Sequence, residues 1–483
     1  MKLFDKYEDN INYLSKKIGV ESSFDTVRRD IVIGGKKAAV FFIDGFAKDD
    51  IMLYLLAILQ NTKHEEIVPN TLEKLITKKI PYIECSESDS YDEIEYMILS
   101  GASVLVIDGI NKAIILDTRT YPARGPQEPD LEKVTRGSRD GFVETVIFNT
   151  ALIRRRVRDP NLRFHITNVG RRSKTDVVIG YIEDITNEDL VKDIKEKLEQ
   201  IDIDSLVMAE KSLEEYILGK TWNPFPQARF TERPDVTAAH LLEGHIVIIV
   251  DTTPSVMILP VTMFHFTQHA EDYYQNPTIG TYMRWVRFLA IFFSLVASPL
   301  WLVLANNPEL LPEALSFIGP KEIGEIPLLL QFLVLEIGLD MLRIASIHTP
   351  NALTTSLGII GALLLSDFAV KVGWIIPETV LYTAISGIGM FATPSVEFSL
   401  AMRLFRLVML VAGGLFGPYG LLVGFILFII VLFNTKSFGG INYMWPLVPF
   451  NRRALSTIVT RKPIPEVKRR PEILRPIDKT SKK

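Results

Sequence analysis

The pattern of hydrophobic and polar positions changes near Arg287. Before it, charged and apolar residues alternate over short distances, as they do in water-soluble domains. After it, long apolar runs follow one another, beginning with FLAIFFSLVASPLWLVLA at residues 288–305. A helix needs about 20 apolar residues to cross a bilayer. The second part therefore predicts an α-helical polytopic membrane domain, preceded by a water-soluble region.

The water-soluble region mixes strands and helices without a regular βαβ order. Pairs of apolar runs around short turns predict β-hairpins at residues 31–46, 102–118 and 244–260. Helical patterns lie between them. This order is typical of an α+β (mixed α/β) fold. The Pro- and Gly-rich YPARGPQEPD predicts a boundary between two subdomains, residues 1–118 and 119–285.

The membrane part, residues 286–440, contains five or six apolar segments. Four of them cover residues 288–305, 327–347, 354–372 and 374–392. The run at residues 404–433 forms either one long helix or two helices that fold back at GGLFGPYG, residues 413–420.

The charges of the C-terminal tail favour two helices that fold back at residues 413–420. From Asn451 onward the tail holds eleven Lys or Arg against three acidic residues, so the tail, residues 441–483, is expected to stay cytoplasmic. The N-terminus lacks the apolar core of a signal peptide. With both ends in the cytoplasm, the number of crossings must be even, which favours the hairpin.

The composition excludes several classes of function and of site. The net charge of -4, with 23% charged residues, gives no global cationic field, so we expect no nucleic-acid partner. The single cysteine, Cys85, excludes a disulfide framework and a cysteine-based zinc site, and it suits a reducing compartment.

No motif indicates catalysis. GKT at residues 219–221 resembles the end of a phosphate-binding loop, but Glu214 stands where that pattern needs glycine. GIGMFA at residues 387–392 lies in an apolar run, where small residues favour close helix packing. His265 and His269 have the spacing of two ligands on one helix face, without an obvious third ligand. We therefore expect a protein that is not an enzyme and binds no cofactor or metal.

Three ionisable residues in the second apolar segment are candidates for an ion path. Glu336, Asp340 and Arg343 share one helix face, at positions i, i+4 and i+7. Such groups cost about 2.5–3.5 kcal/mol each at membrane depth, so they should face protein or water. A structural ion pair with Arg343 and the lining of an ion path both stay open. Asp367 and Lys371 suggest a second, structural pair.

A group of arginines ends an apolar-patterned stretch that predicts a helix beginning near Ser138 and Asp140, with Asn149 at the edge of its buried face. The group comprises Arg154, Arg155, Arg156 and Arg158. They either finish the helix as a solvated basic turn or contact acidic groups of lipids or of a neighbouring subunit.

Three stretches of the chain resemble the A subunits of the GerA-type spore germination receptors. They are YPARGPQEPDLEKVTRGSRDGFVETVIFNTALIRRRVRDPNLRF, PFPQARFTERPDVTAAHLLEGHIVIIVDTTPSVMILPVTMFHFTQHAEDYY and LEIGLDMLRIASIHTP. The likeness runs from about residue 25 to residue 455, in the family's order. VRRDIVIGGKKAAVFFIDGFAKDD is closer to a sporulation-associated member of the family than to the nutrient receptors proper.

The resemblance implies a two-part cytoplasmic region on a membrane domain that assembles into a homo-oligomeric ring. The place would be the spore inner membrane, with the N-terminal region and the tail on the spore core side. The role would be an ion channel that releases small cations during germination, beside a B-subunit-like membrane protein and anionic lipids. A secondary transporter and a non-conducting scaffold subunit are the alternatives. The four arginines, as a family-wide element, are then expected to bind acidic groups.

Overall fold

The structure is a computed structural model that describes residues 1–81, 84–119, 132–219, 222–311, 313–321, 324–348 and 369–481. The chain forms two compact units. Unit 1 comprises Met1–Lys220, Ala228–Val261 and Ile464–Lys483, and unit 2 comprises Thr221–Gln227 and Thr262–Pro463. The predicted linker at residues 121–130, most of the apolar segment at residues 354–372, and Asp367 lie outside the described residues.

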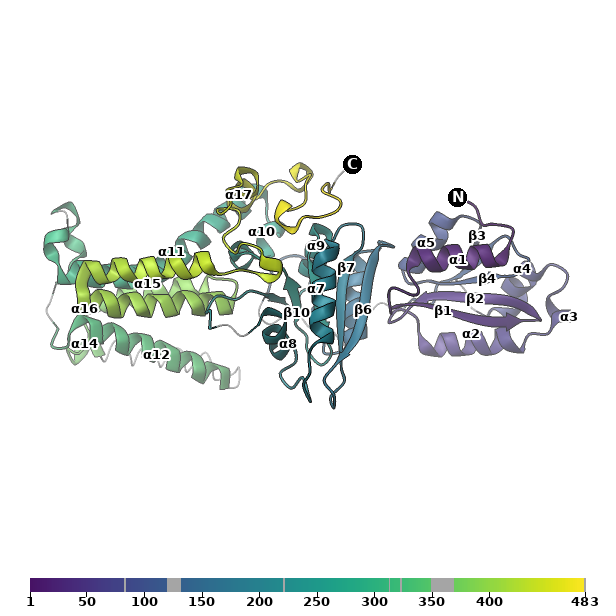
Figure 1. The fold of residues 1–483 in the computed structure, drawn as a ribbon, viewed down its shortest axis with the longest axis horizontal. Coiled ribbons are helices and arrows are strands. Elements are labelled where there is room, and N and C mark those ends of the chain that lie inside the picture. The colour runs from purple at the N-terminus through teal and green to yellow at the C-terminus, as the bar shows by residue number, and fades with distance from the viewer. Residues whose placement is uncertain are drawn as a thin grey trace. The chain divides into compact units, whose positions relative to one another are not determined.

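Unit 1 contains two five-stranded antiparallel sheets of the same topology (Figure 1). The first has the order β1-β2-β4-β5-β3, built from β1 (Thr26–Ile33), β2 (Lys36–Ile43), β3 (Cys85–Ser88), β4 (Ser103–Ile107) and β5 (Ala113–Leu116). The second has the order β6-β7-β9-β10-β8, built from β6 (Leu162–Val169), β7 (Thr175–Ile182), β8 (Arg229–Thr231), β9 (Ile246–Val250) and β10 (Val256–Leu259). The predicted mixed α+β fold of this region is confirmed.

Unit 1 also contains helices and 3-10 turns. They are α1 (Tyr7–Ile18), α2 (Asp49–Asn61), α3 (His64–Ile67), α4 (Thr71–Lys74), the π-helical η1 (Leu75–Lys79), α5 (Tyr91–Leu99), α6 (Val146–Arg156), α7 (Glu188–Glu199), α8 (Ala209–Leu218), α9 (Pro234–Glu243) and the 3-10 turns η7 (Ile464–Glu466) and η8 (Glu472–Leu474). Alternate residues of β2 point to opposite faces: Phe41 packs with α1 and α5, and Val40 packs with α2. Figure 1 shows α1 and α2 on opposite faces of this sheet.

The three predicted hairpins are confirmed. β1 pairs with β2, β4 with β5, and β9 with β10, all antiparallel. In the first turn Gly34 and Gly35 have φ of 55° and 80°, a conformation that glycine adopts without steric cost.

The two sheets belong to an internal repeat that the sequence analysis missed. A helix precedes the first hairpin of each copy, and its fourth residue is a buried asparagine that binds the backbone six residues earlier. Asn10 accepts from the N–H of Phe4 (2.8 Å) and donates to its carbonyl (2.9 Å). Asn149 does the same with Val143, at 2.8 and 2.6 Å. The prediction that Asn149 lies at the buried face of its helix is confirmed.

Helix α6 starts later than predicted. It begins at Val146, whose N–H donates to Oδ1 of Asp251 (3.0 Å). Ser138 and Asp140 do not cap it, because their side chains bind Arg156 instead.

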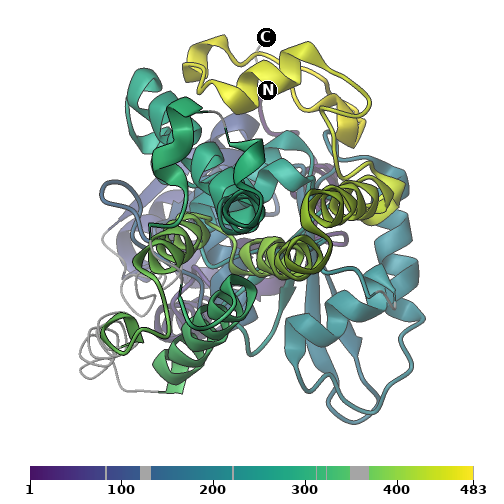
Figure 2. The same cartoon turned by 90° about the vertical axis from the view of Figure 1, so that its left-hand side faces the viewer.

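Unit 2 is helical, and Figure 2 views its long helices from one end. The helices are α10 (Glu271–Tyr274), α11 (Pro277–Asn306), α12 (Leu328–His348), α14 (Ala369–Lys371), α15 (Pro377–Phe391), α16 (Val396–Asn434) and α17 (Arg452–Val459). The 3-10 turns are η2 (Met263–Thr267), η3 (Pro308–Leu310), η4 (Glu313–Ile318) and η6 (Phe438–Gly440). Among the described residues, α11 and α16 are long and apolar enough to cross a membrane. A polytopic organisation stays a prediction.

Helix α16 is a hairpin of two legs. At Gly417, φ is 60° and ψ is -141°, which ends the first leg, residues 396–416, and starts the second, residues 418–434. A Cβ placed on Gly424 would lie 2.9 Å from Met409, so the legs pack closely side by side. The rings of Phe405 and Phe428, one from each leg, are 5.3 Å apart. Of the two arrangements open for residues 404–433, the fold-back is therefore correct.

Candidate functional site

Four charged side chains of α12 and α16 meet inside unit 2, and we call them the charge cluster: Glu336, Asp340, Arg403 and Arg406. Oε2 of Glu336 accepts from Nη2 of Arg406 (2.8 Å) and lies 3.3 Å from Nη2 of Arg403. Arg403 also donates to the backbone carbonyl of Glu336 (2.6 Å) and to the carboxylate of Asp340. Arg406 reaches a third helix, since its Nη1 donates to the carbonyl of Ser294 on α11 (2.6 Å).

The members of the charge cluster differ in burial. The side chains of Glu336 and Arg406 are each 1% exposed and that of Arg403 is 4% exposed, whereas that of Asp340 is 41% exposed. Two carboxylates face two guanidinium groups, so the cluster is neutral as a set. In a low-dielectric interior this neutrality offsets part of the desolvation cost of each charge.

The cluster lies deep along α11. Ser294 is ten residues after Arg284 and twelve before Asn306, the last residue of the helix. At about 1.5 Å per residue, Ser294 is roughly 15 Å from Arg284 along the axis. Buried charges need partners, which explains why each carboxylate meets arginine.

Sequence reasoning found only half of the cluster. The ion pairs of Glu336 and Asp340 described above use Arg403 and Arg406. The partner suggested by the sequence pattern was Arg343, which is half-buried. The missed signal is the pair of arginines, three residues apart, within the apolar pattern of α16. Isolated cations in such a run indicate acidic partners on another helix.

Among the candidate arginines of α6, Arg154 is used inside unit 1. Its side chain is fully buried, and its Nε and Nη2 donate to the two carboxylate oxygens of Asp25, at 2.9 and 3.0 Å. It also donates to the carbonyl of Leu162 (3.2 Å) and lies over the ring of Phe164. The expectation that Arg154 meets acidic groups of lipids or another subunit is wrong, because its acid belongs to the same chain.

The other three arginines lie closer to the surface. Nη2 of Arg156 donates to both carboxylate oxygens of Asp140, at 2.6 and 2.7 Å. Nη1 of Arg158 donates to the hydroxyl of Tyr96 (3.1 Å), and Arg155 is exposed. An external contact remains a prediction for Arg155 and Arg158 above all.

The contacts of this basic turn lower the pKa of the Asp140 carboxyl. Burial by itself raises its pKa, but hydrogen bonds from Arg156 and Ser138, together with the charge of Arg156, outweigh burial and hold the pKa below its usual value. A depressed carboxyl pKa stabilises the fold above the pKa of the unfolded chain, about 3.9, and the contribution disappears as the pH falls through the lower folded pKa.

Asp140→Asn is therefore expected to lower the free energy of unfolding of unit 1 at neutral pH, and the difference from the wild type should shrink below about pH 4. Hydrogen exchange of the α6 amides, followed between pH 3 and 7 with correction for intrinsic rates, measures this difference. Asp202→Asn is the matched control, since its carboxylate is largely exposed. A difference as large for Asp202→Asn would contradict the assignment.

Two sequence motifs have structural explanations. In GIGMFA, a Cβ on Gly389 would lie 2.2 Å from the carbonyl oxygen of Ala290, so glycine lets α15 approach α11 closely. The GKT motif follows α8, which ends at Leu218, as expected for a helix end. Lys220 and Thr221 lie outside the described residues.

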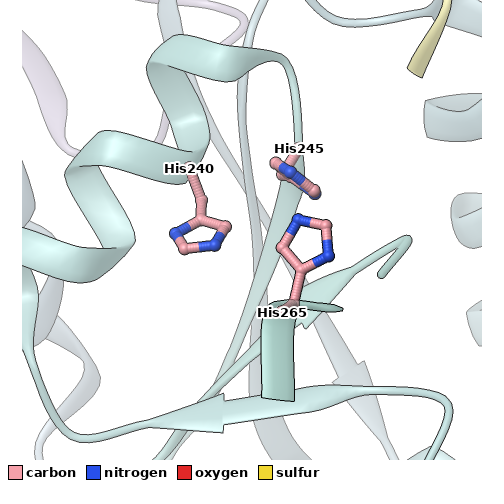
Figure 3. Close-up of side chains that lie close together, drawn as sticks. All are labelled: His240, His245 and His265. Carbon is pink, nitrogen blue, oxygen red and sulfur yellow. The ribbon is translucent and has the colours of Figure 1, made fainter. Parts of the chain in front are cut away.

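His265 and His269, whose spacing would suit two ligands on one helix face, lie in different local structures. His265 lies in the 3-10 turn η2, and His269 precedes α10, so the two do not share a helix face. In unit 1, the rings of His240 and His245 lie 5.0 Å apart (Figure 3). Figure 3 also labels His265, which belongs to unit 2.

Comparison with known proteins identifies the family. Residues 12–473 match the family described as Bacillus/Clostridium GerA spore germination protein. The chain is 43% identical over 467 residues to stage V sporulation protein AF of Bacillus subtilis (strain 168), covering 97% of this chain and 94% of that protein. It is 33% identical over 478 residues to spore germination protein KA of the same organism, covering 97% and 87%.

One solved structure is similar to part of the chain. It is the crystal structure of the N-terminal domain of the A subunit of the Bacillus megaterium spore germinant receptor GerK3, with 32% identity and a TM-score of 0.41, covering 53% of this chain and 96% of that chain. The resemblance noted in the sequence, including that to the sporulation-associated member, protein AF, is confirmed. The chain belongs to the GerA family of spore germination proteins.

Proposed function

We propose that the chain is a multi-pass subunit of a germination complex in the spore inner membrane, where copies of it form a ring that passes small cations. Membership in the GerA family supports the role in germination. The observation that carries the ion path is Asp340, a carboxylate that is 41% exposed on a helix among apolar surfaces.

The surface around Asp340 favours contact with a second copy. Helix α12 exposes a stripe of apolar residues at alternating spacings of four and three: Leu330, Val334, Ile337, Met341 and Ile344. This spacing is that of a helix–helix seam. Asp340 lies beside the stripe, and a carboxylate facing lipid is unfavourable. Protein and water supplied by a neighbouring copy would relieve that cost.

The connections of unit 2 support an even number of crossings. The N–H of Met263, before α11, donates to the carbonyl of Tyr443, after α16 (2.9 Å). Arg284, near the start of α11, donates to the carbonyl of Thr457 (2.8 Å). The chain therefore enters and leaves the helical bundle at one end. Its final segment, Ile464–Lys483, returns to unit 1, which favours the spore core side for both the N-terminal region and the basic tail.

The two acids of the charge cluster have different roles in the proposed ion path. Glu336 is enclosed by Arg403 and Arg406 within one chain, so its role in the proposal is to hold α12 against α16. Asp340, with Arg343 one turn further, faces outward and would line the passage. Arg155 and Arg158, at the surface of unit 1, would contact acidic groups of a neighbouring copy or of anionic lipids.

Partners and alternatives follow from the same reasoning. A B-subunit-like membrane protein is the expected companion, and we propose release-coupled conduction in place of direct nutrient sensing. A secondary transporter would favour broken helices at matched positions. Among the long helices described for unit 2, α16 is the one with non-helical dihedral angles inside, so the transporter has less support. A non-conducting scaffold remains the main alternative.

Asp340→Asn is expected to lower cation conductance about fivefold, because a charge about 4 Å from a passing ion attracts it by about 1 kcal/mol even in water. The measurement is potassium flux from liposomes that contain the full chain. Glu309→Gln, an exposed acid in η3, is the matched control and should leave the flux unchanged.

Particle size is measured on the same protein in detergent, where a multiple of the 54.6 kDa chain is expected. A ring without any flux would favour the scaffold. A monomer would contradict the shared passage.

A further inference from the structure

A short loop between two elements of unit 1 is built into unit 2. It follows α8 and precedes β8, and both of these elements belong to unit 1, whereas Thr221–Gln227 belongs to unit 2. We call its described residues, 222–227, the anchor loop.

Phe225 fixes the anchor loop among the aromatic rings of unit 2. It is 2% exposed. Its ring stacks on Phe405 at 5.4 Å and lies 6.1 Å from Phe398, both on the first leg of α16. It meets Phe428 of the second leg edge-on at 6.0 Å and Tyr443 at 6.1 Å. One side chain from the anchor loop thus touches both legs of the hairpin.

Hydrogen bonds hold the backbone of the anchor loop as well. Oδ1 of Asn223 accepts from the N–H of Phe225 (3.0 Å), and its Nδ2 donates to the hydroxyl of Thr435 (2.6 Å), the residue after the second leg. The hydroxyl of Ser437 donates to the carbonyl of Gln227 (3.4 Å). The anchor loop is therefore held at Asn223, Phe225 and Gln227, by α16 and by the residues that directly follow it.

The connection from the anchor loop to the second sheet is short. Only Ala228, which is fully buried, separates Gln227 from Arg229, the first residue of β8. β8 pairs with β10, where Arg229 lies opposite Ile258. Since a residue spans at most about 3.6 Å, a displacement of β8 by more than a few ångströms cannot be absorbed before Phe225 is pulled.

We propose that the anchor loop transmits displacements of the second sheet to the two legs of α16, with Phe225 as the positioning residue. Burial of the Phe225 side chain and its contacts with other aromatic rings attach the anchor loop firmly to α16. The connection to β8 is short, because Ala228 alone separates Gln227 from Arg229. This inference concerns mechanical coupling and stands whether or not the chain conducts ions.

The test perturbs the sheet and observes the hairpin in the full chain, held in nanodiscs. Ile258→Ala loosens β10, and hydrogen exchange at residues 398–410 is the readout. In the wild-type background we expect the exchange rate there to rise about threefold, as local opening becomes easier. With two glycines inserted after Gln227, which keep Phe225 but slacken the connection, Ile258→Ala should leave this rate unchanged.

The insertion separates transmission from simple packing. If Phe225 only fills the core, the insertion leaves the response to Ile258→Ala intact, and that result would overturn the proposal, as would the absence of any response in the wild-type background. The same two glycines inserted after Arg171, in the exposed turn between β6 and β7, are the matched control and should preserve the response. Phe225→Leu, which weakens the attachment but keeps an apolar side chain, should reduce the response and covers a failure of the insertion variant to fold.

Discussion

Replacing Arg154 with leucine is expected to destabilise unit 1 by about 3–5 kcal/mol, because the change leaves a buried carboxylate without its cation. The side chain of Asp25 is 2% exposed. After the change, the hydroxyl of Ser23, at 2.6 Å, still donates to it, but a hydroxyl carries no compensating charge. The carbonyl of Leu162 also loses its donor. Hydrogen exchange of the β6 and β7 amides in the full chain measures the loss.

The neighbouring arginine supplies the control. Arg155 is exposed, and Arg155→Leu should change the stability by no more than about 0.5 kcal/mol. The double variant Asp25→Asn with Arg154→Leu removes both charges, so it should recover part of the loss. Equal effects at Arg154 and Arg155 would refute the buried ion pair and would return both residues to the surface role expected from sequence.

Local patterns predicted those parts of the fold whose signal is contained in a few consecutive residues. Gly34 and Gly35 between two apolar runs gave the first hairpin, because the turn needs positive φ at those positions. The fold-back at Gly417 followed from glycines in the apolar run together with the requirement for an even number of crossings. The first inference used a few consecutive residues, and the second also used the charges of the tail. Neither required the identity of a distant side-chain partner.

Distant partners could not be predicted in this way. The periodicity of α6 placed Asn149 at a buried face, but it did not show that Arg154 would meet Asp25, which lies 129 residues earlier. Likewise, α12 revealed Glu336 and Asp340, while Arg403 lies more than 60 residues away on α16. Periodicity fixes which face of a helix is buried, and tertiary packing decides which side chain it meets.

In the charge cluster, the helix pattern revealed the acids and tertiary packing supplied the arginines. Among substitutions in this cluster, we expect replacement of Glu336 to destabilise the chain most. Glu336→Leu leaves the guanidinium groups of Arg403 and Arg406 buried together beside a single, half-exposed carboxylate, Asp340. Breaking a buried ion pair in this way costs about 3–5 kcal/mol. We expect most of the full chain to be lost as aggregate when it is extracted from membranes and analysed by size-exclusion chromatography.

Restoring neutrality should restore the fold in part. In the double variant Glu336→Gln with Arg406→Gln, one charge of each sign disappears, and Asp340 still faces Arg403. Glu397→Gln, an exposed position near the start of the same leg, is the control and should give the wild-type yield. A normal yield for Glu336→Leu would mean that Glu336 is hydrated in the membrane and would move it into the proposed passage. The proposal expects a low yield for Glu336→Leu, and a normal yield with altered flux for Asp340→Asn. These results together would show that Glu336 holds the helices and that Asp340 faces the ion.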